Sequence, residues 1–83
     1  MNKLFHDKGF DDYVYWQTQD RKTLDKINRL LQSIERDGVM KGEGKPERLK
    51  YGLGYSRRID EANRLVYDIE DNRIIIKACR GHY

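Results

Sequence analysis

Residues 55–80, YSRRIDEANRLVYDIEDNRIIIKACR, decide the fold. They hold three short segments rich in β-branched and aromatic residues, at 55–59, 64–70 and 73–80, a composition typical of strands. In the second segment Leu65, Tyr67 and Ile69 recur at every second position. Alternation with period two places these three side chains on one face of a strand and Arg64 on the other.

The residues between these segments indicate how the strands connect. Asp71-Asn72 is a tight-turn pair between the last two segments, and residues 60–63 form a slightly longer turn before them. Asp and Asn favour turns because their side chains bond to nearby backbone and tolerate left-handed conformations. The sequence therefore predicts an antiparallel meander.

Residues before the meander predict two helices. From 21 to 36 the apolar residues recur three and four positions apart, which buries one helical face, and Asp37-Gly38 ends this helix. An earlier helix is predicted around Asp11-Asp12, since acidic residues suit the positive end of a helix. Residues 3–5 predict a short first strand, and residues 41–46, with two glycines and the only proline, a loop.

Together these elements predict a single α+β domain over residues 1–83, with two N-terminal helices packed on a small antiparallel β-sheet. A chain of 83 residues builds only one core. The helices are expected to cover one face of the sheet and to leave the other face for a ligand.

Composition excludes several classes of protein. One cysteine and two histidines rule out an internal disulfide and a zinc framework, so neither a metal nor another cofactor is expected. No apolar run is long enough to span a membrane, and a cytoplasmic location is expected. Of the net charge of +3, residues 41–58 carry six basic and two acidic groups. This segment either binds a polyanion or is a solvated loop, and charge alone does not decide between them.

Without metal ligands, the chemistry open to the chain is acid–base and electrostatic, which suffices to cleave RNA. Glu47 lies among basic residues that would keep it ionised, as a general base must be; a surface ion pair is the simpler interpretation of the spacing alone. Arg58 and Arg64 are candidates for holding a phosphate, or for salt bridges to nearby acids. His82 is the candidate general acid and Tyr83 a group that stacks on a base or binds phosphate, unless the tail is frayed.

Several stretches, in order along the chain, resemble the YoeB/Txe toxins of the RelE/ParE superfamily of bacterial toxin–antitoxin systems. They are residues 11–16 (DDYVYW), 26–28 (KIN), 44–47 (GKPE), 49–50 (LK), 56–59 (SRRI), 64–67 (RLVY) and 78–83 (ACRGHY).

The resemblance implies a microbial-ribonuclease-like fold and a metal-independent endoribonuclease that cuts mRNA in the A site of the 70S ribosome. It implies roles for six residues, with Glu47 as base, Arg64 as phosphate ligand, His82 as acid, Tyr83 completing the site, and Lys50 and Arg58 as supporting cations. It also implies a YefM-like antitoxin as partner and a possible homodimer.

Two features depart from the family pattern. Residues 50–56 are about two residues shorter than in the family and lack its bulky tryptophan before Ser56, and Gly81 stands where a bulky residue is common. Two other functions remain open. A ParE-like protein would block DNA gyrase by binding, and a basic module would bind nucleic acid without cutting it. Neither would need Glu47 or the His-Tyr ending.

Overall fold

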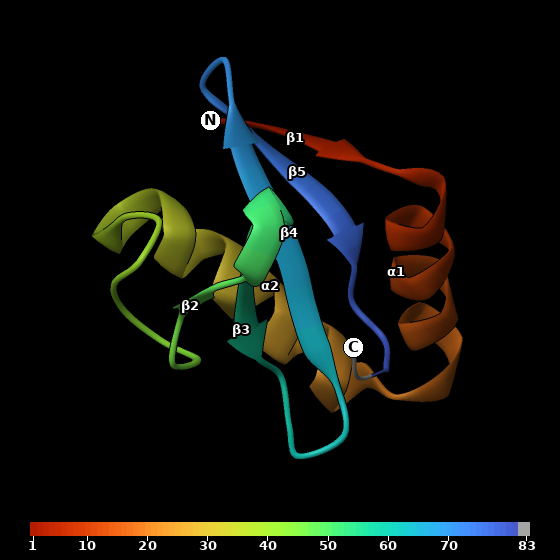
Figure 1. Ribbon diagram of the computed structural model, residues 1–83. Coiled ribbons are helices and arrows are strands. Elements are labelled where there is room, and N and C mark those ends of the chain that lie inside the picture. Colours follow the sequence, from red (N-terminus) through yellow and green to blue (C-terminus); the bar gives the residue numbers. More distant parts are fainter. Residues whose placement is uncertain (82–83) are drawn as a thin grey trace.

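The computed structural model describes residues 1–81; His82 and Tyr83 lie outside the described residues. Two helices pack on a five-stranded sheet with the strand order β1-β5-β4-β3-β2 (Figure 1). The elements are β1 (Asn2–Phe5), α1 (Asp7–Gln19), α2 (Arg21–Asp37), β2 (Glu47–Arg48), the 3-10 turn η1 (Lys50–Gly52), β3 (Tyr55–Arg58), β4 (Arg64–Glu70) and β5 (Arg73–Ala78). The predicted α+β class is confirmed.

The sheet is mixed, which corrects the predicted antiparallel arrangement at one strand. Strands β2 to β5 pair antiparallel, as predicted, whereas β1 runs parallel to β5 with Leu4 opposite Ile75. Short turns fix the direction of consecutive strands, but β1 is separated from β5 by nearly the whole chain. The direction of β1 depends on how the two helices that follow it return the chain to the sheet. Local turn signals in the sequence give no information about this.

The connections in the meander match their sequence signals. Asp71 and Asn72 both have positive φ (51° and 59°), as in a two-residue hairpin turn. In the longer turn Asp60 Oδ1 accepts hydrogen bonds from the backbone N–H groups of Ala62 and Asn63, each at 2.8 Å. The unpredicted elements are β2 and η1, which are too short to show a periodicity.

Helix α2 has the predicted extent, and α1 begins earlier than predicted. Asp20 caps α2 by accepting from two backbone N–H groups, and Gly38 ends the helix with φ 108°. Helix α1 starts at Asp7 and not near Asp11, directly after β1. Gly9 allows this first turn to lie against β5, because a Cβ there would be 2.2 Å from the Ile76 carbonyl oxygen.

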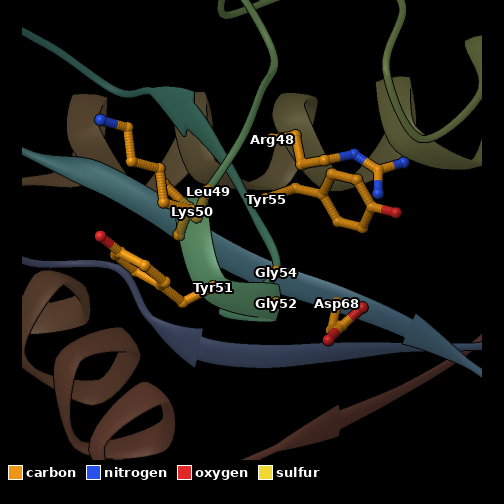
Figure 2. Close-up of a pocket in the computed structure, with 8 residues that line it drawn as sticks. All are labelled: Arg48, Leu49, Lys50, Tyr51, Gly52, Gly54, Tyr55 and Asp68. Atoms are coloured by element: carbon orange, nitrogen blue, oxygen red, sulfur yellow. The ribbon is translucent and has the colours of Figure 1, made fainter.

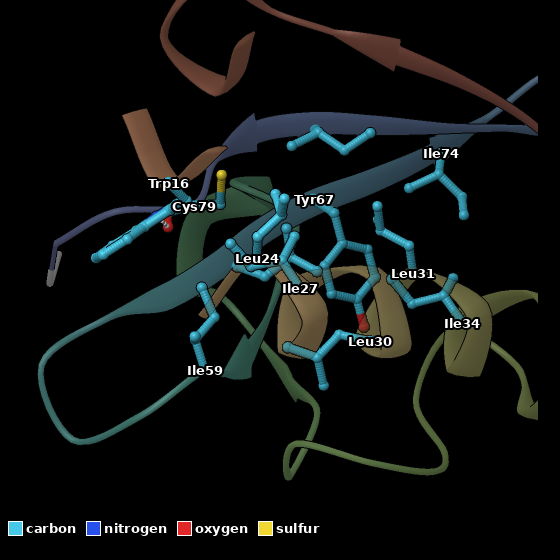
Figure 3. Packing of buried hydrophobic residues seen from close by; sticks show 12 residues of the cluster. Trp16, Leu24, Ile27, Leu30, Leu31, Ile34, Ile59, Tyr67, Ile74 and Cys79 are labelled. Carbon is cyan, nitrogen blue, oxygen red and sulfur yellow. Dashed lines mark hydrogen bonds between the residues drawn. The ribbon is translucent and has the colours of Figure 1, made fainter. Parts of the chain in front are cut away.

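The hydrophobic core lies between the helices and one face of the sheet (Figure 3). Leu65 and Tyr67 of β4 are fully buried there, which confirms the face predicted from alternation. Ile27 and Leu30 of α2 are equally buried. Burial raises the pKa of the Tyr67 hydroxyl, so this group remains neutral.

Arg57, in β3, is an arginine inside this core and not on the basic surface where the sequence placed it. It is fully buried. Its guanidinium donates to the hydroxyls of Tyr67 and Ser33 and to the carbonyls of Gly38, Val39, Lys41 and Glu43. The side chain therefore ties the loop after α2 to the sheet.

Replacing Arg57 with methionine is expected to lower the free energy of unfolding by about 3 kcal/mol, since several buried acceptors lose their donor together. Urea denaturation followed by circular dichroism measures this change. Arg58→Met, at the adjacent exposed position, is the matched control, and its stability should change by less than about 0.5 kcal/mol. Equal losses in both variants would contradict the assigned role of Arg57.

Candidate functional site

The face of the sheet turned away from α2 carries a row of residues from three strands. Glu47 of β2 pairs with Ser56 of β3, and Ser56 pairs with Val66 of β4. The neighbours Arg57 and Tyr67 bond to each other inside the core, so the row itself points to the opposite face. The antiparallel pairing thus brings Glu47 from the edge strand onto the open face.

Arg58 and Arg64 form the next row of this face. They are directly paired across β3 and β4, and like charges in that position are destabilising. Neither arginine has a salt bridge within residues 1–81. Of the three acids nearby in sequence, Asp60 caps its own turn and Asp68 lies 3.7 Å from Lys77, while Glu61 is exposed and forms no salt bridge with either arginine. Two facing cations with no acid between them are an arrangement suited to an anionic ligand.

Three buried polar atoms within residues 1–81 lack hydrogen-bond partners, and by the strand register all three are on this face: Nη1 of Arg64, Oγ of Ser56 and, at the far end of the β4–β5 hairpin, Nε of Arg73. Buried polar groups are almost always paired, so each such atom calls for an explanation. Arg64 as a residue is only half-buried, so the rest of its side chain keeps exposed surface that an anionic ligand could contact. Sequence reasoning assigned no role to Ser56; its position between Glu47 and Val66 becomes visible only from the strand register.

Glu47 and Lys50 line a common groove. Residues 47–51 and Leu53 line the groove, and Tyr51 and Leu53 form its apolar side. Figure 2 shows that Lys50 and Tyr51 extend to the side of this loop opposite to Tyr55 and Asp68. Glu47 makes no salt bridge within the described part of the chain, so the surface ion pair offered by the spacing is not formed there.

The loop at 49–54 covers part of the face that was expected to be free. The carbonyl of Leu53 accepts from Lys77 Nζ at 3.2 Å, and Gly54 lies against the Tyr67 carbonyl. The prediction of an uncovered face therefore needs correction. Ser56 is fully buried, and the exposed parts of this face are at Glu47, at Arg58 and in the groove beside Lys50. Tyr51, with φ 62° and 93% exposed, stands at the rim of that groove.

The chain reaches this face again at Gly81. The backbone N–H of Arg64 donates to the Gly81 carbonyl at 3.1 Å, and the Gly81 N–H donates to Asn63 Oδ1 at 2.8 Å. Gly81 has φ 93°, a conformation that glycine adopts without strain. Residues up to Gly81 are therefore held beside Arg64, while the predicted site residues His82 and Tyr83 lie outside the described residues.

The basic residues of the segment 41–58 do not all lie on one surface. Arg57 is internal, and Glu43 is bonded to Lys26 at 2.8 Å, which lowers the pKa of that carboxyl. Of the exposed cations that remain, Lys50 and Arg58 are near the open face, whereas Arg48 lies over the ring of Tyr55 on the other side of β2. In residues 1–81 no cluster of three His, Cys, Asp or Glu side chains is placed to hold a metal ion. None of the described helices has the length and apolarity needed to cross a membrane.

The fold and this face define a small α+β protein in which two paired arginines lie beside a carboxylate that forms no salt bridge within residues 1–81. A sequence model described as "YoeB-like toxin of bacterial type II toxin-antitoxin system" matches residues 5–83. The chain belongs to this family.

Individual relatives agree with the family match over the whole chain. Toxin YoeB of Streptomyces coelicolor is 49% identical, with all of both chains covered. The structure of a YoeB dimer from Staphylococcus aureus is 50% identical with a TM-score of 0.93, covering 100% of this chain and 98% of that one. A YoeB-YefM complex from the same organism is 48% identical with a TM-score of 0.92 and the same coverage.

Proposed function

We propose that this toxin is a ribosome-dependent, metal-independent endoribonuclease that cuts mRNA in the ribosomal A site and thereby stops translation. The observation that carries the proposal is the open face itself, where Glu47 lies one row from the paired cations Arg58 and Arg64. Family membership supports it, because this arrangement falls on the residues in which the chain resembles YoeB/Txe toxins.

The reaction needs one base, one acid and a cation. Glu47 takes the proton of the ribose 2′-hydroxyl, whose oxygen attacks the neighbouring phosphorus. Arg64 holds the charge that develops on the phosphorane oxygens. His82 gives its proton to the 5′-oxygen as the phosphorus–oxygen bond breaks. The products are a 2′,3′-cyclic phosphate, which can open to a 3′-phosphate, and a 5′-hydroxyl.

The remaining site residues bind and orient. Arg58 faces Arg64 across the strands and shares the charge of the phosphate. Lys50 lines the groove beside Glu47 and contacts the next phosphate along the strand. Tyr83 completes the site by contacting the nucleotide at the cut.

Two protein partners follow from the relatives. A YefM-like antitoxin is proposed to bind this chain and to cover or distort the open face, as the complex from S. aureus supports. A homodimer is also proposed, and the YoeB dimer from S. aureus supports it. The cytoplasmic location stays a prediction from the sequence.

Primer extension tests the proposal. Wild-type protein is expected to produce discrete cuts in an mRNA that is being translated in an extract, and none in the same mRNA without ribosomes. His82→Ala should remove the cuts while the protein still binds ribosomes. A non-catalytic binding module or a gyrase blocker would leave the mRNA intact in every lane, and that result would reject the nuclease.

A further inference from the structure

Helix α1 holds the chain directly after β5 ends, at Cys79. The Cys79 N–H donates to Asp12 Oδ2 at 3.0 Å, and its carbonyl accepts from Trp16 Nε1 at 2.8 Å. Figure 3 shows Trp16 lying beside Cys79. Asp12, Trp16 and Cys79 are 7%, 9% and 0% exposed, so these bonds are shielded from water. The hydrogen bonds between strands end at Ala78. At Cys79, side chains of α1 take the place of a neighbouring strand as hydrogen-bond partners.

The same helix also holds Arg80. Lys8 Nζ donates to the Arg80 carbonyl at 3.4 Å and pairs with Asp12 at 2.8 Å, one helical turn away. The Arg80 guanidinium lies over the ring of Tyr15, with its central carbon 3.6 Å from the ring centroid. The direction of the chain at Arg80 is therefore set from the α1 side.

Gly81 is held from the opposite side, by the turn before β4. Asn63 and Arg64 bond to the N–H and the carbonyl of Gly81. Asn63 is itself fixed, because its backbone N–H and its amide both bond to Asp60. Residues 79–81 follow the end of β5. They are held by α1 on one side and by Asn63 and Arg64, at the start of β4, on the other.

We infer that Asp12 and Trp16 are positioning residues for the reaction, because they fix the direction in which the chain leaves the sheet toward its terminal acid. This inference rests on the proposed function, in which His82 protonates the leaving 5′-oxygen. A buried carboxylate bonded to a main-chain N–H makes a strong, directional tie, and misplacement of a catalytic group by about 1 Å can reduce a rate by about 10²-fold.

A change of leaving group separates positioning of the acid from a general structural role. In the normal substrate the 5′-oxygen must receive a proton as its bond to phosphorus breaks. If sulfur replaces that oxygen, the leaving group is a thiolate, which is stable without a proton because thiols are far more acidic than alcohols. A defect confined to the acid therefore disappears with the sulfur substrate, whereas a damaged site cuts both substrates slowly.

The experiment measures single-turnover cleavage of ribosome-bound mRNA with either oxygen or sulfur at the 5′ position of the cut. Asp12→Ala removes the acceptor for Cys79, and Trp16→Phe removes the donor while keeping an aromatic ring. Each is expected to cut the oxygen mRNA about 10²-fold more slowly than wild type and the sulfur mRNA at nearly the wild-type rate. Asp12→Asn keeps an oxygen that accepts from Cys79 and should restore most of the activity. Asp11→Ala, exposed on the same helix, is the control.

Circular dichroism melts accompany each variant, and if Asp12→Ala does not fold then Trp16→Phe carries the test. Equal losses on both mRNAs, or no loss on either, would overturn the positioning role while leaving the nuclease intact. Absence of cleavage by the wild type would instead remove the proposed function, and this inference with it.

Discussion

Arg64→Ala is expected to slow mRNA cleavage by about 10²–10³-fold, the usual effect of removing one preplaced donor to a developing oxyanion. Arg64 is the site residue whose guanidinium is partly sequestered, with Nη1 buried and without a partner in residues 1–81. Its backbone also bonds to Gly81 through the N–H, which alanine retains. The substitution therefore removes the phosphate contact and keeps the tie to the tail. Single-turnover cleavage on programmed ribosomes measures the loss.

Arg73→Ala is the matched control for this prediction. Arg73 is a half-buried arginine at the far end of the β4–β5 hairpin, beside Asp71. It is on the same face of the sheet but at the opposite end of β4 from Arg64, and its loss should leave the cleavage rate almost unchanged. Arg64→Lys keeps the charge without the planar fork and should recover only part of the activity. If Arg64→Ala folds and cleaves like Arg73→Ala, the phosphate role of Arg64 is wrong.

Glu47→Gln is the second large effect, with an expected loss of about 10²–10⁴-fold, the range for one positioned proton transfer. The amide matches the carboxylate in size but cannot take a proton from the 2′-hydroxyl. Because Glu47 is exposed and makes no salt bridge in the described chain, the fold should not change. Thermal melts test whether the fold is unchanged, and the same single-turnover assay measures the loss of cleavage.

Glu61→Gln is the control for removing one negative charge. Glu61 is exposed in the turn before β4, and none of the salt bridges among residues 1–81 involves it. Ribosome binding should be alike in the two variants. A Glu47→Gln protein that cleaves as fast as Glu61→Gln would show that another group is the base.

The fold was largely predictable because its signals are local. The spacing in α2, the alternation in β4 and the turn at Asp71-Asn72 each act within a few residues, and the structure confirms all three. The direction of β1 and the early start of α1 were missed for the opposite reason. Both depend on contacts with β5, some 70 residues away along the chain.

The sequence named candidate site residues, whose roles stay predictions, but it did not show how these residues are arranged. The sequence could not tell that Arg57 turns into the core while Arg58 turns out, since that depends on the strand register. It also gave no sign that Asp12 and Trp16 hold Cys79, because those bonds join residues more than 60 positions apart. The sequence also left open that Glu47 and Arg64 are ordinary ion-paired residues, and neither forms a salt bridge within residues 1–81.

The most direct test of the central claim uses an mRNA with a single 2′-deoxynucleotide on the 5′ side of the phosphate that is cut. In the proposed reaction the 2′-oxygen is the nucleophile, so this mRNA should bind in the A site and remain whole, while the all-ribose mRNA is cut to a 2′,3′-cyclic phosphate. Cleavage of both mRNAs at the same phosphate and at similar rates would mean that water is the nucleophile, and would contradict the mechanism assigned to Glu47, Arg64 and His82.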